Sequence, residues 1–159
     1  MKLSEFVVAG SVIPELEATD RDEAVRELVA SLVTAKKMSS DKVDVVTRAL
    51  LKRENKGTTG FGRGIAVPHL RVCPEVTEPV IAIGRTTRGV DFTSLDARPV
   101  HSIVLLLIPP DHTECHLQCM EKIFLYLKRD NFRRFLQQAD TVGAIMELFR
   151  EMDEATEES

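Results

Sequence analysis

The sequence predicts an α/β domain in which helices cover both faces of a single sheet. Three observations indicate this class: two helical patterns occupy the first third of the chain, apolar strand-like runs follow, and three more helical patterns end it. Helices before and after a group of strands are typical of a three-layer α/β/α fold. A length of 159 residues suits one domain with a substantial core. We therefore expect residues 1–150 to form a single domain.

The two N-terminal helices are predicted from their caps and apolar spacing. The first should follow Thr19 and Asp20, because Asp20 and Glu23 have capping-box spacing. The second should start after Ser39 and Ser40 and end near Arg53, since four glycines follow between residues 57 and 64. The apolar residues expected to face the core are Ala24, Val25, Leu28, Val29, Leu32 and Val33 in the first helix, and Val43, Val46, Ala49 and Leu50 in the second.

Strands are expected at residues 65–67, 80–83 and 100–108. The last is an almost unbroken aliphatic run, as in a central strand buried on both faces. Pro68 follows the first strand, so the chain is predicted to leave the sheet there and to place His69 at the strand exit.

Three further helices are predicted at about residues 112–129, 131–138 and 140–152, with Asp140 capping the last. Met120, Phe124 and Leu127 recur at helical spacing and are interpreted as core. The acidic end, residues 151–159, is predicted to be a disordered tail.

Composition excludes several classes of protein. The net charge of −4 gives no support to nucleic-acid binding, which normally requires a basic surface. The longest apolar run, residues 103–110, is far shorter than the roughly 20 residues of a membrane span, and no secretion signal is recognisable at the N-terminus. Three cysteines fit a reducing cytoplasm better than a disulfide scaffold. We expect a cytoplasmic protein without nucleic-acid partners or membrane insertion.

The glycine-rich segment, residues 53–69, is the part of the chain that suggests chemistry. It lies in a region, residues 48–98, whose nine basic and five acidic residues could attract a small anion, although solvated surface charge is the simpler interpretation. Its glycines fit neither the phosphate-binding P-loop nor the dinucleotide fingerprint, because no Gly-Lys-Ser/Thr follows and the spacing differs. A histidine such as His69 can accept a phosphoryl group on a ring nitrogen. Taken alone, His69 is better explained as a hydrogen-bonded turn residue.

The wider pattern resembles a known family. Three runs resemble the active-site signature of type-2 enzyme IIA domains: Arg-Glu at residues 53–54, Gly-Thr-Thr-Gly-Phe-Gly at 57–62 and, after one unspecified residue, Gly-Ile-Ala-Val-Pro-His at 64–69. These domains belong to the bacterial phosphoenolpyruvate-dependent sugar phosphotransferase system, in its fructose/mannitol and nitrogen-regulatory group. The likeness continues through Gly89-Val90-Asp91-Phe92 and His116-Leu117, and it covers most of residues 5–150.

The resemblance implies a phosphocarrier with a small mixed sheet, of the fold shared by phosphotransferase and anion-transport proteins. It implies that His69 takes a phosphoryl group from the phosphohistidine of the small carrier HPr, with His116 and Arg53 assisting. Thr58, Thr59 and Gly60 would form the loop at the phosphoryl site. No cofactor or metal is expected, and the phosphoryl acceptor would be a sugar-specific IIB domain or a regulated protein. Leu70 departs from the small residue expected after the histidine, which could alter a docking surface.

Two alternatives remain open. The chain could be a regulatory or interaction module that keeps the IIA fold, with phosphorylation of His69 as its switch. Less favoured is a zinc module through the four side chains His112, Cys115, His116 and Cys119, which one helix would spread over about 10 Å, too far for one ion. Cys73 is interpreted as a spectator thiol and His101 as structural.

Overall fold

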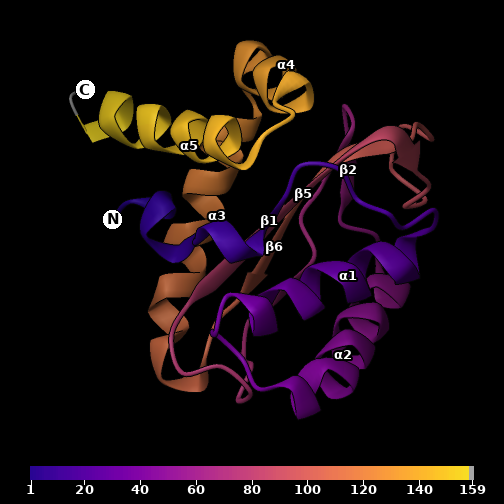
Figure 1. Ribbon diagram of the computed structural model, residues 1–159, viewed down its shortest axis with the longest axis vertical. Coiled ribbons are helices and arrows are strands. Elements are labelled where there is room, and N and C mark those ends of the chain that lie inside the picture. The colour runs from indigo at the N-terminus through magenta and orange to yellow at the C-terminus, as the bar shows by residue number, and fades with distance from the viewer. Residues whose placement is uncertain (158–159) are drawn as a thin grey trace.

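A mixed sheet forms the middle layer of the protein in the computed structural model, which describes residues 1–157 (Figure 1). Its strand order is β1-β5-β6-β3-β2, and β4 pairs with β6 beside β3. β5 and β6 run antiparallel, whereas β1 is parallel to β5, and β3 and β4 are parallel to β6. The strands are β1 (Val12–Ile13), β2 (Gly60–Gly62), β3 (Ile65–Ala66), β4 (His69–Leu70), β5 (Val80–Val90) and β6 (Val100–Leu107).

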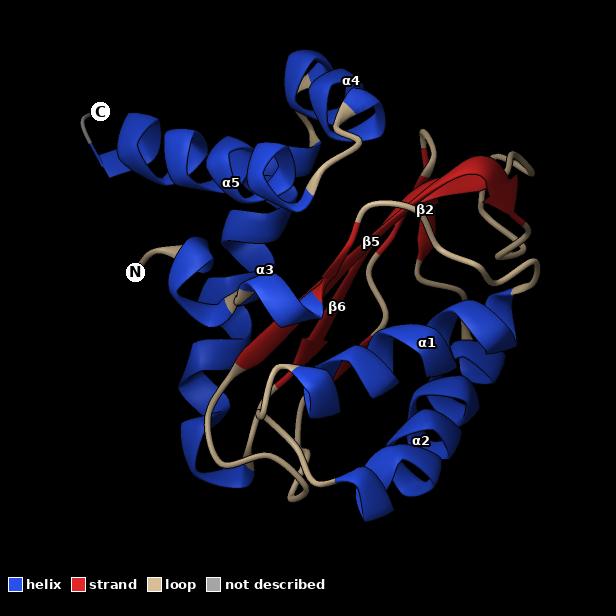
Figure 2. Ribbon diagram, viewed as in Figure 1, coloured by secondary structure: helices blue, strands red, loops and turns tan. Residues whose placement is uncertain are grey.

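Helices cover both faces of this sheet, as Figure 2 shows. α1 (Arg21–Thr34) and α2 (Val43–Lys56) lie on one face. α3 (Thr113–Leu127), α4 (Asp130–Gln138) and α5 (Val142–Glu157) lie on the other, with the N-terminal 3₁₀ turns Leu3–Phe6 and Ala9–Ser11. Two further 3₁₀ turns, Ser40–Lys42 and Pro110–His112, lead into α2 and α3. None of the helices within residues 1–157 has the length and apolarity that crossing a bilayer requires.

Strand β6 shows how the sheet divides the core. Side chains alternate between the faces of a strand, so Ile103, Leu105 and Leu107 pack with α1 and α2. Val104 and Leu106, which point the opposite way, pack with the apolar residues of α3, α4 and α5. All five are fully buried. The three-layer α/β/α prediction is therefore confirmed, and it follows from a strand whose residues 103–107 are all apolar and buried on both faces.

The predicted N-terminal helices form with small differences. Asp20 caps α1, since its Oδ1 accepts a hydrogen bond from the Glu23 backbone N–H at 2.8 Å. Val33, Val43 and Ala49 are half-buried rather than buried, because they lie at the edges of the apolar faces. α2 extends to Lys56, a few residues beyond the expected end.

The prediction that the chain leaves the sheet at Pro68 is wrong. Proline has no N–H to donate, so the hydrogen-bond ladder with β6 is interrupted between β3 and β4. Its carbonyl still accepts a hydrogen bond from Leu106 N at 3.0 Å, and pairing with β6 resumes at once, with His69 opposite Leu106. Leu70 packs its side chain against the α1/α2 core.

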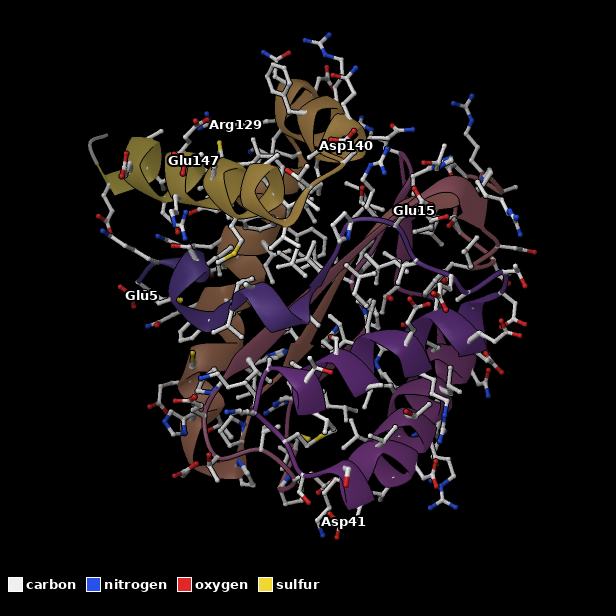
Figure 3. The ribbon with its side chains drawn as sticks, viewed as in Figure 1. Glu5, Glu15, Asp41, Arg129, Asp140 and Glu147 are labelled. Atoms are coloured by element: carbon white, nitrogen blue, oxygen red, sulfur yellow. The ribbon has the colours of Figure 1, made fainter. Side chains whose placement is uncertain are left out.

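Two predictions at the C-terminus are also wrong. Thr141, not Asp140, caps α5, because Thr141 Oγ1 accepts a hydrogen bond from Ala144 N. The exposed Asp140 lies at the outer surface with the other charged residues labelled in Figure 3. The predicted disordered tail is helical through Glu157, and residues 158–159 lie outside the described part.

Asp153 gives the physical reason for this ordered end. Its side chain is 1% exposed and accepts hydrogen bonds from Leu3 N (3.0 Å), Ser4 N (2.9 Å) and Tyr126 Oη. It thereby joins the N-terminal turn, α3 and α5. Burial and the Asp153 carboxylate together raise the pKa of Tyr126 far above its ordinary value.

Candidate functional site

The loop between α2 and the sheet is fixed by a buried glutamate. Glu54 lies on the inner face of α2, one turn after Leu50, and is 3% exposed. Its Oε2 accepts a hydrogen bond from Thr59 N at 2.9 Å, and its Oε1 accepts one from Thr59 Oγ1. Hydrogen bonds to a buried charge are among the stronger ones in proteins. This pair holds the end of α2 against the start of β2.

The glycines of this segment allow close backbone packing. A Cβ added at Gly60 would lie 2.4 Å from Ser94 Oγ, so no larger residue fits without a shift. Arg63 and Gly64 both have positive φ, 59° and 80°, and form the tight turn between β2 and β3. The glycines therefore shape a hairpin, and the hairpin directs the chain into β3 and onward to His69.

His69 is held with one ring nitrogen engaged. Its Nδ1 lies 2.8 Å from the carbonyl oxygen of Val67. A carbonyl can only accept, so Nδ1 carries the hydrogen and Nε2 keeps its lone pair. Burial lowers the pKa of His69 below its ordinary value, and the nearby Arg53 guanidinium lowers it further, against the opposing effects of the Val67 carbonyl and Glu54. The ring is therefore held in the neutral, nucleophilic form.

His116 lies beside His69, although 47 residues separate them in sequence. The ring centroids are 5.4 Å apart with an interplanar angle of 35°. His116 Nε2 is buried and has no hydrogen-bond partner among residues 1–157. Burial, then the charges of His69 and Arg71, lower the pKa of His116. His116 is in the first turn of α3, and the N-terminal end of a helix favours an anion nearby.

Arg53 completes the group of predicted residues near His69. It lies in the last turn of α2, where its Nη1 donates to the Gly57 carbonyl at 2.8 Å. This bond leaves the other guanidinium donors for a ligand. The structure thus brings together His69, His116 and Arg53, each from a different element.

The loop hydroxyls are used within the protein. Thr58 Oγ1 donates to the Phe92 carbonyl at 2.6 Å and accepts from Gly60 N, while the fully buried Thr59 donates to Glu54. Their contact with a phosphoryl group remains a prediction.

Sequence reasoning assigned no role to Glu54 or Arg71. For Glu54 a signal existed: it follows Val46 and Leu50 at helical spacing, which places a carboxylate on the buried face of α2. For Arg71 no sequence signal distinguished it from other surface charges, because its proximity to His116 arises only from the fold.

The remaining histidines and cysteines lie apart from this group or pack within the protein. No cluster of three or more His, Cys, Asp or Glu side chains within residues 1–157 could hold a metal ion. Cys115 and Cys119 contact each other at 3.5 Å, and burial raises the pKa of Cys119 to about 12 and that of Cys73 to about 11. His101 Nδ1 lies 2.9 Å from the Thr86 carbonyl, which agrees with a structural role.

Comparisons with known proteins identify the class. Residues 5–152 match the family described as "Phosphoenolpyruvate-dependent sugar phosphotransferase system, EIIA 2", so the chain belongs to that family. Membership makes it a IIA-type phosphotransfer component.

Individual relatives come from both branches of the family. A nitrogen regulatory protein of Pseudomonas aeruginosa is 36% identical over 148 residues, which are 93% of this chain and 94% of that protein. The fructose-specific EIIABC component of Bacillus subtilis is 29% identical over 153 residues, which are 96% of this chain but only 24% of that protein. The crystal structure of the nitrogen regulatory protein IIA-Ntr of Neisseria meningitidis superposes with a TM-score of 0.81 at 25% sequence identity, covering 92% of this chain and 97% of that one.

Proposed function

We propose that the protein is a phosphohistidine carrier in which His69 Nε2 accepts a phosphoryl group from a phosphorylated HPr-like protein. The observation that carries this proposal is the His69 ring itself. Its Nδ1 hydrogen is held by the Val67 carbonyl, and its neutral form is favoured by burial. This arrangement leaves the Nε2 lone pair unused by the Val67 contact, on a side chain that is only half-buried.

In the proposed step, the Nε2 lone pair forms a bond to phosphorus while the bond from phosphorus to the donor's histidine nitrogen breaks. The donor nitrogen keeps the electron pair, so no oxidant, nucleotide or metal is needed. The transition state spreads negative charge over the phosphoryl oxygens. Arg53 would balance that charge with its remaining donors. His116 Nε2, which is buried and has no partner among residues 1–157, would hydrogen-bond a phosphoryl oxygen.

The phosphoryl group then passes to a IIB domain or serves as a switch on a regulated protein. The near full-length match with a nitrogen regulatory protein favours the regulatory use. The match with a segment of a fructose-specific component supports transfer toward a sugar as the second candidate. Both uses begin with the same phosphorylation of His69, and both fit a cytoplasmic protein.

The proposal is tested by peptide mapping after incubation with phosphoenolpyruvate, enzyme I and HPr. One acid-labile phosphoryl group on His69 is expected. His69→Ala should abolish labelling with the fold intact, and His116→Ala should slow onward transfer more than acceptance. His101→Ala serves as a matched control, because His101 is also a half-buried histidine on the sheet. Labelling that survives in His69→Ala would refute the assignment.

A further inference from the structure

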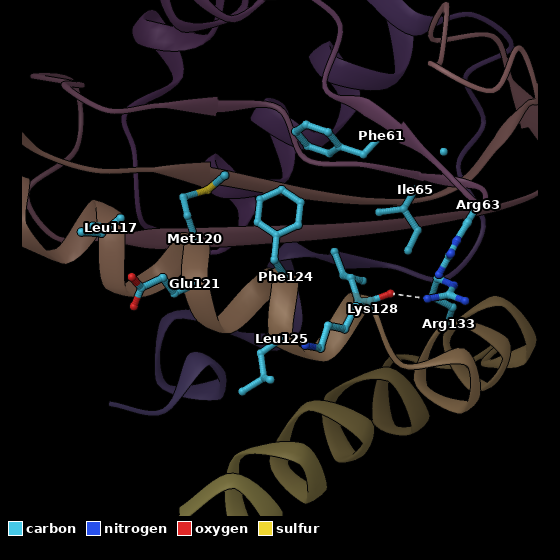
Figure 4. Close-up of a pocket in the computed structure, with 12 residues that line it drawn as sticks. Phe61, Arg63, Ile65, Leu117, Met120, Glu121, Phe124, Leu125, Lys128 and Arg133 are labelled. Atoms are coloured by element: carbon cyan, nitrogen blue, oxygen red, sulfur yellow. Dashed lines mark hydrogen bonds between the residues drawn. The ribbon is translucent and has the colours of Figure 1, made fainter.

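An apolar groove runs along the outside of α3, between that helix and the β2–β3 hairpin. Its volume is about 630 Å³. Figure 4 shows Phe61 of the hairpin above Phe124 of α3, and the two rings meet edge to face with centroids 4.9 Å apart. Leu117 and the acidic Glu121 lie toward one end of the groove, and Arg63, Lys128 and Arg133 lie toward the other.

The groove exposes apolar side chains of α3, among them Phe124, which the sequence assigns to the core. Phe124 is 36% exposed and Leu117 is 64% exposed, whereas Cys119 and Ile123 of the same helix are buried. α3 is therefore apolar on two faces, one against the sheet and one open to solvent. The interpretation of Phe124 as core is wrong, because helical spacing cannot distinguish these faces, whereas the half-buried Met120 packs against the core and also lines the groove.

The open face has the form that a partner helix requires. Leu117, Met120, Phe124 and Lys128 follow one another at steps of three and four residues, a continuous stripe about 16 Å long at 1.5 Å per residue. Helix-in-groove recognition uses anchors at the same spacing. The stripe starts directly after His116, so it adjoins the proposed phosphoryl site.

Charge at the far end defines the chemistry of the partner. Arg63 and Lys128 are exposed, and neither forms a salt bridge with a carboxylate in the described part of the chain. Arg133 is already engaged, since it donates to the Leu127 carbonyl at 2.7 Å and pairs with Asp130. Two unpaired cations beside an apolar stripe complement acidic residues at one end of an apolar helix.

We infer that this groove, formed by α3 and the β2–β3 hairpin, docks an acidic amphipathic helix of a regulated partner protein. The partner's apolar face lies over Phe61, Met120 and Phe124, and its acidic end meets Arg63 and Lys128. Its other end reaches the His69–His116 site. The assignment of the partner as a regulated protein rests on the proposed function, but docking of the helix does not require phosphorylation of His69.

The test uses synthetic peptides and the unphosphorylated full chain. The probe is a peptide of about 14 residues with leucines at helical spacing and a cluster of glutamates at one end. Two versions are made, one with the glutamates at the N-terminus and one with them at the C-terminus. Calorimetry should show that the better version binds at least about tenfold more tightly than its lysine counterpart or a scrambled peptide. Backbone amide shifts should locate it on α3 and the hairpin.

Matched variants separate the groove from general surface effects. Phe124→Ser should weaken peptide binding at least about tenfold, while Phe135→Ser, at a phenylalanine exposed elsewhere, should leave it unchanged. Arg63→Glu with Lys128→Glu should reverse the preference toward the lysine peptide. Phosphorylation of His69 is measured separately on the parent chain, where its failure would count against the proposed function and not against the groove. Loss of phosphorylation in Phe124→Ser alone would assign the groove to the phosphoryl donor and would overturn the inference.

Four other results would overturn the inference. The scrambled or lysine peptide could bind as tightly as the acidic one, or Phe135→Ser could weaken binding as much as Phe124→Ser. Sedimentation could show a dimer that Phe124→Ser dissociates, which would assign the groove to a second copy of the chain. Anionic phospholipid vesicles could bind the chain through Lys128 when the acidic peptide does not, which would assign it to a membrane surface.

Discussion

Replacing Glu54 by glutamine tests how the site loop is held. The carboxylate accepts two hydrogen bonds from Thr59, one from its N–H and one from its hydroxyl. Glutamine keeps a single acceptor oxygen and turns an NH₂ group toward the second donor. The change is nearly isosteric, so it removes charge and one acceptor without opening a cavity.

The expected cost follows from these contacts. One hydrogen bond to a charged group, worth about 1.5–3 kcal/mol, is lost, and a donor is left unpaired where water cannot reach it. Because Glu54 is 3% exposed and Thr59 is fully buried, we expect the free energy of unfolding to fall by about 3 kcal/mol. Phosphoryl acceptance should also slow, since the loop carries the chain toward His69.

Urea unfolding measures the first effect and the labelling rate of His69 measures the second. A lower midpoint with an unchanged slope is expected. Glu27→Gln is the control: Glu27 Oε1 also accepts two backbone hydrogen bonds, from Glu17 N and Ala18 N, but the residue is only half-buried. Losing one of these hydrogen bonds in Glu27→Gln should lower the free energy of unfolding by less than about 1 kcal/mol, because water can take the place of the lost acceptor. A Glu54→Gln protein within about 1 kcal/mol of the parent would refute the reasoning.

Two further predictions concern pH and the C-terminal helix. NMR titration should give His69 a pKa below the ordinary histidine value of about 6.5. The rate of phosphoryl acceptance should therefore stay at its maximum as the pH falls past about 6.5. The stabilisation from the neutral ring should be complete only above about pH 6.5 and should be lost as the pH falls through the lower pKa of the folded protein. Arg53→Gln should raise this pKa, and a pKa that stays fixed or falls would contradict the role of the guanidinium. Asp153→Ala should lower the free energy of unfolding by about 3–5 kcal/mol, because two N-terminal amides and the Tyr126 hydroxyl lose a buried partner. The neighbouring exposed Glu154→Ala is its control, and equal stabilities in urea would show that Asp153 does not anchor the helix.

Local sequence determined the five long helices, the central strand β6 and the resemblance to the family, but not the short strands β1, β2 and β4 or the full length of β5. The Asp20 cap, the glycine stop after α2 and the unbroken aliphatic run of β6 each act within a few residues, so their spacing predicts them. The signature around His69 likewise lies in one continuous segment. These features sufficed for the three-layer fold and for the candidates His69 and Arg53, whereas His116, which lies outside that segment, was expected only from the family resemblance.

Tertiary structure decided what those residues touch. His69 pairs with β6 because the Leu106 N–H donates to the Pro68 carbonyl. Leu106 is distant in sequence, so the residues next to His69 do not predict this pairing. Helix α5 extends through Asp153 because the Asp153 carboxylate accepts hydrogen bonds from Leu3 N and Ser4 N, at the other end of the chain. The approach of His116 to His69 depends in the same way on how α3 packs against the sheet. Such contacts join distant segments, and their energies depend on burial that spacing along the chain does not encode.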